Sequence, residues 1–211
     1  MSKGKGNKLF DFSRKAAPQR LKICLAIPCG GTVRIETLLS VVGILSNTPH
    51  DIYFAYKESS YIEWNRSELI RTAIKQGCSK LFFLDADIMV EQDVINKLLA
   101  HNKPIIGAAY NNRALPLFSN VKIADESGKF IAAPELPKEP FKCAGVPTGC
   151  MLIDIPTVQK IPQPWFDLTY FEDGSLNLGE DIYFCQKAIE HGFEVWCDPT
   201  IQIGHIGTFV Y

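Results

Sequence analysis

The chain has 211 residues, of which 46% are hydrophobic and 21% charged, and its formal net charge is -1 at neutral pH. A chain of this length can bury roughly 70% of its unfolded surface in one large domain, so it needs neither a disulfide nor a zinc site to fold. The near-neutral charge argues against a strongly basic nucleic-acid-binding protein, and no apolar run approaches the ~20 residues that a membrane-spanning helix needs.

The amino-terminal segment, residues 1–20, is basic. Its charged residues are Lys3, Lys5, Lys8, Arg14, Lys15 and Arg20, against one acid, Asp11. This composition predicts a solvated, flexible tail, with weak peripheral contact with an anionic membrane surface as the alternative. The tail lacks the apolar stretch of a secretory signal. The seven cysteines are odd in number and irregularly spaced, which indicates a reducing, cytoplasmic setting.

Residues 21–113 alternate short apolar strands with helices. The expected elements, in chain order, are a strand at Leu21–Pro28, a helix at Arg34–Ser46, a strand at Ile52–Tyr56, a helix at Ile62–Gln76, a strand at Leu81–Leu84, a helix at Glu91–His101 and a strand at Ile105–Tyr110. The run Leu81–Leu84 is entirely apolar, which is typical of a strand buried on both faces. This alternation predicts an α/β fold with a mostly parallel central sheet flanked by helices.

Residues 114–211 follow a different pattern. A hairpin is expected across Ser127-Gly128, and the polar stretch Asp167–Leu178 is expected to form a mobile loop over the site. The remaining elements are strands at Cys150–Ile155, Glu194–Cys197 and Ile201–Ile206, and a helix at Glu180–His191. We therefore expect a single domain, residues 21–211, with a smaller antiparallel hairpin region in its second half.

An acidic triplet, Asp85-Ala86-Asp87, directly follows the apolar strand Leu81–Leu84. Residues two apart in an extended chain point to the same side, so both carboxylates can face one point at the carboxyl end of a strand, where open α/β sheets bind ligands. Two close carboxylates repel each other unless a cation neutralises them, and a divalent metal carrying a diphosphate would do so. The alternative is an aspartate pair at a turn, one of which caps the helix that is expected from Glu91.

Two further features are candidates for chemistry. Asp181 follows Glu180 at the start of a helix and lies on the inward side of that helix. The positive end of the helix dipole favours the ionised form of Asp181, which makes it a candidate proton acceptor, although both acids are also common helix starters. His205 lies between Gly204 and Gly207, whose small size lets another group approach closely; a structural histidine is the alternative.

These motifs together resemble the GT-A fold glycosyltransferases, in particular the family 2-like enzymes that contain a D-x-D triplet. The resemblance rests on the order and spacing of the motifs over roughly residues 21–207. The matching segments are Ile23–Gly31, Asn65-Arg66, Lys80–Val90 (KLFFLDADIMV), Pro104–Arg113 (PIIGAAYNNR), Gly145–Ile153 (GVPTGCMLI), Pro164-Trp165-Phe166, Gly179-Glu180-Asp181 and Gly204-His205. It implies a Rossmann-like GT-A domain with a nucleotide-binding half, residues 21–113, and an acceptor-binding half, residues 114–211.

The resemblance further implies a metal-dependent transfer from a nucleoside-diphosphate sugar, most often a UDP-sugar in that family. It implies that Asp87 ligates the metal directly and that Asp85 binds the ribose or a metal-bound water. His205 would be a further ligand, and its nitrogen favours Mn²⁺ over Mg²⁺. The expected contacts of the nucleotide and its phosphates are Pro28, Gly30, Arg34, Arg66, Asp85 and Arg113.

On the acceptor side, the resemblance implies an inverting transfer to a hydroxyl group of a carbohydrate or glycan, with Asp181 as general base. Glu180 would contact the acceptor or orient the site. Trp165, which is expected in a surface segment, is a candidate to stack on a sugar ring, and Gly149 is expected to let the backbone pass close to the transferred sugar. A retaining transferase of the same fold, a nucleotidyltransferase that makes the sugar nucleotide, and a non-catalytic binding domain remain alternatives.

Overall fold

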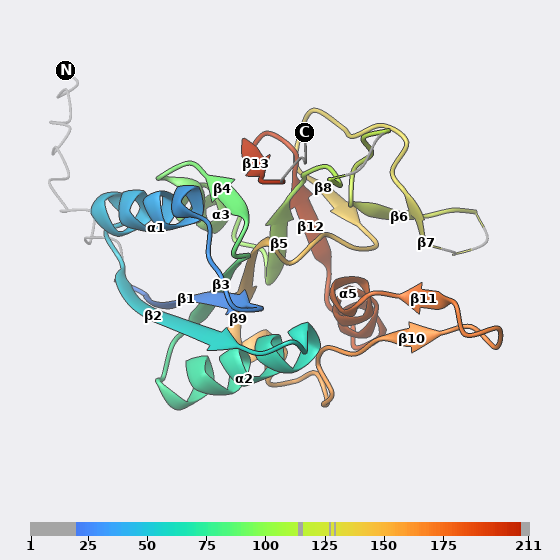
Figure 1. Ribbon diagram of the computed structural model, residues 1–211, viewed down its shortest axis with the longest axis horizontal. Coiled ribbons are helices and arrows are strands. Elements are labelled where there is room, and N and C mark those ends of the chain that lie inside the picture. Colours follow the sequence, from blue (N-terminus) through green and yellow to red (C-terminus); the bar gives the residue numbers. More distant parts are fainter. Residues whose placement is uncertain (1–19, 114–115, 127, 129, 208–211) are drawn as a thin grey trace, which may run out of the picture.

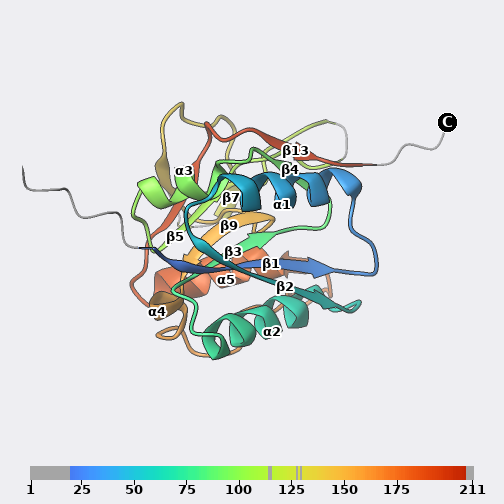
Figure 2. The same cartoon turned by 90° about the vertical axis from the view of Figure 1, so that its left-hand side faces the viewer.

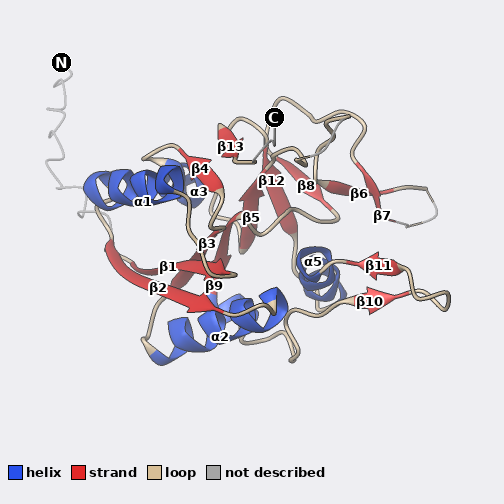
Figure 3. Cartoon of the chain, in the orientation of Figure 1, coloured by secondary structure: helices blue, strands red, loops and turns tan. Residues whose placement is uncertain are grey.

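The computed structural model describes residues 20–113, 116–126, 128 and 130–207. Their centre is a seven-stranded mixed β-sheet with helices on both faces (Figure 1 and Figure 3). Residues 1–19 of the basic tail, and Ser127 of the expected hairpin turn, lie outside the described residues. Within the described ranges, no helix combines the length and the apolar character that crossing a bilayer requires.

The central sheet has the strand order β2-β1-β3-β9-β5-β12-β8. Its strands are β1 (Lys22–Cys29), β2 (Asp51–Glu58), β3 (Lys80–Leu84), β5 (Ile105–Ala108), β8 (Phe141–Cys143), β9 (Cys150–Asp154) and β12 (Val195–Asp198). The strands β2, β1, β3, β5 and β12 share one direction, whereas β9 and β8 run the opposite way. The prediction of a mostly parallel sheet is confirmed, with β9 as an antiparallel strand between β3 and β5.

The helices form a layer on each face of this sheet (Figure 2). On one face lie α1 (Ile35–Asn47) and α3 (Val94–Ala100); on the other lie α2 (Ile62–Lys75), α4 (Ile155–Val158) and α5 (Glu180–Glu190). In β3, Leu81 and Phe83 pack with the α2 and α5 layer, and Phe82 and Leu84 with the α1 and α3 layer. Successive strand residues point to opposite faces, so the prediction that β3 is buried on both sides is confirmed.

Three small antiparallel pairs complete the fold. They are β4 (Ile88–Val90) with β13 (Ile203–His205), β6 (Lys122–Ala124) with β7 (Phe130–Ala132), and β10 (Thr169–Tyr170) with β11 (Leu176–Leu178). The β6–β7 pair confirms the expected hairpin. The stretch Asp167–Leu178, which we expected to be a loop, contains the β10–β11 hairpin. The expected helix from Glu91 begins only at Val94, and the Glu91 side chain accepts a hydrogen bond from the backbone N–H of Gln202.

The segment Pro164-Trp165-Phe166 is part of the core, so the expectation of an exposed Trp165 is wrong. Trp165 is only 5% exposed, and its indole N–H donates to two backbone carbonyl oxygens at and just after the end of α4. The Phe166 ring stacks on Phe184 of α5 at 4.9 Å between centroids and meets Phe83 of β3 edge-on at 5.8 Å. These rings therefore tie the strand before the acidic triplet to the helix that carries Asp181.

All seven cysteines lie in the described part of the chain, and each is free and buried. Burial raises the pKa of the Cys24 thiol to about 12, with a smaller contribution from Cys78. Thiols held in this way stay protonated and unreactive, and they act as small apolar side chains in the core.

Candidate functional site

A cleft of about 610 Å³ opens where β1 and β3 end. The loop after β1, the first turns of α2, the acidic triplet and the start of α5 form its walls. Predicted nucleotide contacts that line it are Pro28, Gly30, Arg34, Arg66, Asp85 and Arg113, joined by Asp87 and Glu180. The volume lies within the range of about 300–1,000 Å³ that is usual for small-molecule sites. The fold thus brings these predicted residues to one cleft.

The floor of the cleft is a buried ion network centred on Arg66. Two guanidinium nitrogens donate to the two carboxylate oxygens of Asp85 at 2.8 and 3.1 Å, and Nε donates to Glu180 at 3.3 Å. The Arg66 side chain is only 4% exposed. Burial alone would lower the pKa of Arg66, but the Asp85 and Glu180 carboxylates raise it above its ordinary value. Arg66 therefore pairs with both acids, although its single positive charge offsets only one of the two negative charges, and its nitrogens are not free to bind a phosphate.

The position of Arg66 is set by its neighbour Asn65, at the start of α2. The Asn65 side-chain amide donates to the carbonyl oxygens of Cys29, at the end of β1, and of Ser59. These bonds hold the first turn of α2 against the end of β1 and the residue that follows β2, and Asn65 is completely buried. Arg66 is consequently directed across the strand ends toward Asp85.

Asp87 and His205 face each other across the pairing of β4 with β13. His205 is in register with Ile88, and the N–H of Ile206 donates to the carbonyl oxygen of Asp87 at 2.9 Å. This pairing brings His205 Nε2 to 3.7 Å from Asp87 Oδ2. Arg113 also contacts that carboxylate oxygen, at 2.5 Å, and its side chain is 53% exposed.

The orientation of the His205 ring fits a bound cation. Its Nδ1 lies 2.8 Å from the carbonyl oxygen of Asn111. A carbonyl only accepts hydrogen bonds, so Nδ1 carries the proton, and in the neutral ring Nε2 presents a lone pair to the Asp87 carboxylate. An oxygen donor and a nitrogen donor thus face each other at 3.7 Å, and the Arg113 guanidinium contacts the same Asp87 oxygen. The Tyr110 ring, edge-on at 5.1 Å, holds the imidazole in place.

The expected ligand set of Asp85, Asp87 and His205 is not assembled as a trio. Among the residues with described positions, no three His, Cys, Asp or Glu side chains converge as a metal site. The physical reason is that Arg66 engages both oxygens of Asp85. Asp87 and His205 remain as a two-residue set of one oxygen and one nitrogen donor. A metal held there would take its other ligands from a donor diphosphate and water.

Asp181 lies half-buried in the first turn of α5. Its Oδ1 accepts the N–H of Ile182 at 2.8 Å. Burial raises the pKa of Asp181, the Glu180 charge raises it as well and Arg66 lowers it, and the net value is about 6. The expectation that the helix start would favour the ionised form is therefore corrected, because burial outweighs the dipole. At neutral pH the carboxylate is still mostly ionised, and it binds a proton far more readily than an exposed aspartate would.

Tyr110 and Gly149 pack against each other beside Asp85. A Cβ on Gly149 would lie 2.3 Å from Tyr110 Oη and 2.9 Å from Asp85 Oδ2, and the Gly149 carbonyl accepts the N–H of Asp85 at 3.0 Å. Glycine is thus required so that these two side chains fit. The expectation that Gly149 lets the backbone pass close to a transferred sugar stays a prediction. Burial and the charge of Asp85 raise the pKa of Tyr110 well above its usual range.

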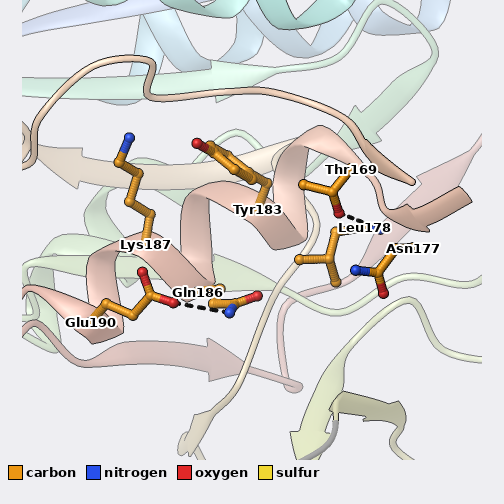
Figure 4. Close-up of a pocket in the computed structure, with 7 residues that line it drawn as sticks. All are labelled: Thr169, Asn177, Leu178, Tyr183, Gln186, Lys187 and Glu190. Atoms are coloured by element: carbon orange, nitrogen blue, oxygen red, sulfur yellow. Dashed lines mark hydrogen bonds between the residues drawn. The ribbon is translucent and has the colours of Figure 1, made fainter. Parts of the chain in front are cut away.

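A second, smaller cavity of about 240 Å³ lies between α5 and the β10–β11 hairpin (Figure 4). Its wall is mostly polar and consists of Thr169, Asn177, Leu178, Tyr183, Gln186, Lys187 and Glu190. Gln186 donates to Glu190 at 2.9 Å, and the Lys187 ammonium lies 5.5 Å from the centroid of the Tyr183 ring. Nothing in the sequence pattern singled out this cavity, because its residues are spread over a hairpin and one helix face.

Comparison with known proteins identifies the fold and nothing finer. No protein-family model matches the chain, and no curated protein matches it in sequence. Among solved structures, the chain is similar to A197 from STIV, with a TM-score of 0.63 and 15% identity. The match covers 89% of this chain and 87% of that one. The two proteins therefore share an α/β architecture with a mixed central sheet.

The ion network makes a direct prediction about stability. We expect Arg66→Met to lower the free energy of unfolding by about 3–5 kcal/mol at pH 7, because it leaves two partly buried carboxylates without their cation. Urea denaturation at pH 7 measures this loss.

Arg71→Met is the matched control, because Arg71 is 44% exposed and pairs with Glu68 on the same helix. Its cost should stay below about 1 kcal/mol. Equal losses in the two variants would show that Arg66 does not carry the buried network.

Proposed function

We propose that the protein is a metal-dependent glycosyltransferase of the GT-A type, which transfers a sugar from a nucleoside-diphosphate sugar to an acceptor hydroxyl group. The main support is that one cleft, at the strand ends of an α/β sheet, is lined by Asp85, Asp87 and Glu180. His205 lies 3.7 Å from Asp87, and Asp181 follows Glu180 in the first turn of α5. A cleft of this size suits a nucleotide sugar.

The donor side follows from the residues that line the cleft. In this proposal Pro28, Gly30 and Arg34 contact the nucleoside, and Asp85 binds the ribose while Arg66 holds it in place. Arg113 is the cation best able to reach a diphosphate, because its side chain is half-exposed and its partner is Asp87 at the edge of the cleft.

Asp87 and His205 are the residues that would hold a divalent ion, and their oxygen and nitrogen donors suit Mn²⁺. When bound, such an ion would supply positive charge for the leaving diphosphate. The chain contributes the geometry in which the ion would sit. The Asn111 carbonyl fixes the histidine tautomer, and the β4–β13 register brings the two ligands together.

Asp181 is assigned the role of general base. Its carboxylate takes the proton from the acceptor hydroxyl as that oxygen forms a bond to the anomeric carbon. The bond from this carbon to the donor phosphate breaks, and the nucleoside diphosphate leaves with the bonding electrons. The cavity of Figure 4 supports an acceptor that approaches along α5, since its amide groups and the Tyr183 ring suit a sugar.

The metal assignment predicts how a nucleotide binds. Wild-type protein should bind UDP much more tightly with Mn²⁺ than with a chelator, and Asp87→Asn and His205→Ala should each weaken the Mn²⁺-dependent binding at least ~10-fold, about 1.4 kcal/mol. Isothermal titration calorimetry measures these affinities. His191→Ala, at an exposed histidine at the end of α5, is the control and should bind as wild type. A UDP affinity that changes neither with Mn²⁺ nor in the two variants would refute the assignment.

The base assignment predicts a separation of binding from chemistry. Asp181→Asn should lower UDP release from a panel of UDP-sugars by about 10²–10⁴-fold, because it removes the proton acceptor. Its affinity for UDP with Mn²⁺ should stay within about twofold of wild type, since Asp181 does not belong to the metal pair. Near-wild-type turnover in Asp181→Asn would exclude it as the base.

The raised pKa of Asp181 predicts a pH profile. Only the ionised carboxylate accepts a proton, so kcat/KM should rise about tenfold per pH unit up to about pH 6 and then level off. Glu180→Gln should move this rising limb to lower pH, because the charge of Glu180 contributes to the raised pKa. Steady-state kinetics across pH 4–8 tests both statements, and an unmoved limb in Glu180→Gln would contradict the coupling.

A further inference from the structure

Helix α1 directs most of its aliphatic residues outward. The large aliphatic side chains that predicted this helix are all exposed: Ile35 by 63%, Leu38 by 40%, Leu39 by 63%, Val42 by 58% and Leu45 by 49%. The buried side of the helix has two hydroxyl residues, Thr37 and Ser40, beside two aliphatic ones, Val41 and Ile44. The helical spacing was therefore a correct signal for a helix, but this apolar stripe faces away from the core.

Hydrogen bonds on the inner side fix this orientation. Thr37 Oγ1 donates to the carbonyl oxygen of Ala86, within the acidic triplet, at 3.1 Å. Ser40 Oγ accepts the N–H of Val90 in β4 at 3.0 Å, and the N–H of Arg34 donates to the same Ala86 carbonyl at 2.8 Å. The helix cannot turn its stripe inward without breaking these bonds, so the exposed apolar face is a stable feature of the fold.

A basic residue, Arg20, is held near the carboxyl end of α1. α1 ends at Asn47, and four residues later Asp51 donates its backbone N–H to Leu21 and pairs with the Arg20 guanidinium at 2.8 Å. Residue 20 is thus held close to the carboxyl end of α1. The segment that leads to it, residues 1–20, has six basic residues and one acidic residue. The only charged residue of α1 itself is Glu36.

We propose that α1 docks the protein on an anionic lipid bilayer, with the outward stripe in the interface and the basic segment, residues 1–20, on the lipid headgroups. Stable peripheral binding needs two such signals, apolar insertion and positive charge, and the chain has both: the stripe of α1 and the basic sequence that leads into Arg20.

Docking in this way would hold the cleft at a fixed place relative to the membrane, because Ala86 joins α1 to the acidic triplet. The inference rests on the exposed stripe and the basic segment, and it stands independently of the proposed transferase activity.

The test is co-sedimentation of the full chain with vesicles. Vesicles of phosphatidylcholine and phosphatidylserine, in a ratio of about three to one, should bind the protein, and vesicles of phosphatidylcholine alone should bind it much less. The double variant Leu39→Gln, Val42→Gln should bind the anionic vesicles at least ~10-fold more weakly, because it removes two inserting side chains. The triple variant Lys3→Glu, Lys5→Glu, Lys8→Glu should also bind less, and salt should weaken the wild type.

Leu176→Gln is the matched control, because Leu176 is 56% exposed on the β10–β11 hairpin, away from α1 (Figure 1). It should bind vesicles as wild type does, and far-ultraviolet circular dichroism should show all variants folded. Unchanged vesicle binding by the α1 double variant would overturn the proposal. A wild-type dimer that becomes monomeric in that variant would also overturn it and would assign the face to a second copy of the chain.

Discussion

The site depends on one buried interaction, the ion network of Arg66 with Asp85 and Glu180. The folding of the chain brings a carboxylate from the end of β3 next to another from the start of α5, in a region with little access to water. Two such charges repel each other and are costly to desolvate, so a cation from α2 is a condition for the cleft to form at all. Arg66 pairs with both oxygens of Asp85, and Asp87 is the aspartate of the triplet that faces His205.

The rest of the site is positioned by strand pairing and ring packing. The β4–β13 register brings His205, from the end of the described chain, beside Asp87. Phe166 packs between Phe83 of β3 and Phe184 of α5, and so couples the strand before the triplet to the helix that carries Asp181. Segments that are far apart in sequence therefore meet through rigid elements, which is what a preorganised site requires.

Much of the fold could be predicted from local patterns. The apolar run of β3 indicated burial on both faces, and the position of the triplet after it indicated the cleft. Periodicity identified α1 but not the direction of its stripe, because a period reveals that one face is apolar and not what that face contacts. Prolines before Trp165 suggested a surface segment, whereas its indole N–H found carbonyl partners inside the fold.

The ion network could not be predicted from the sequence for a different reason. Arg66 and Glu180 are separated by 114 positions in the sequence, so no local motif shows that they form an ion pair. The same applies to Tyr110, whose phenol reaches Gly149, and to the raised pKa of Asp181, which arises from burial that only the folded chain has. Each of these features depends on a tertiary contact.

The central claim is that Arg66 secures Asp85 so that Asp87 and His205 can hold a metal beside a donor diphosphate. The most direct measurement is anomalous diffraction from crystals grown with Mn²⁺ and UDP. The account predicts a manganese peak within about 2.0–2.3 Å of Asp87 Oδ2 and His205 Nε2, with the diphosphate on its open side and Arg66 still paired to Asp85. Bound UDP with no manganese between Asp87 and His205 would contradict it.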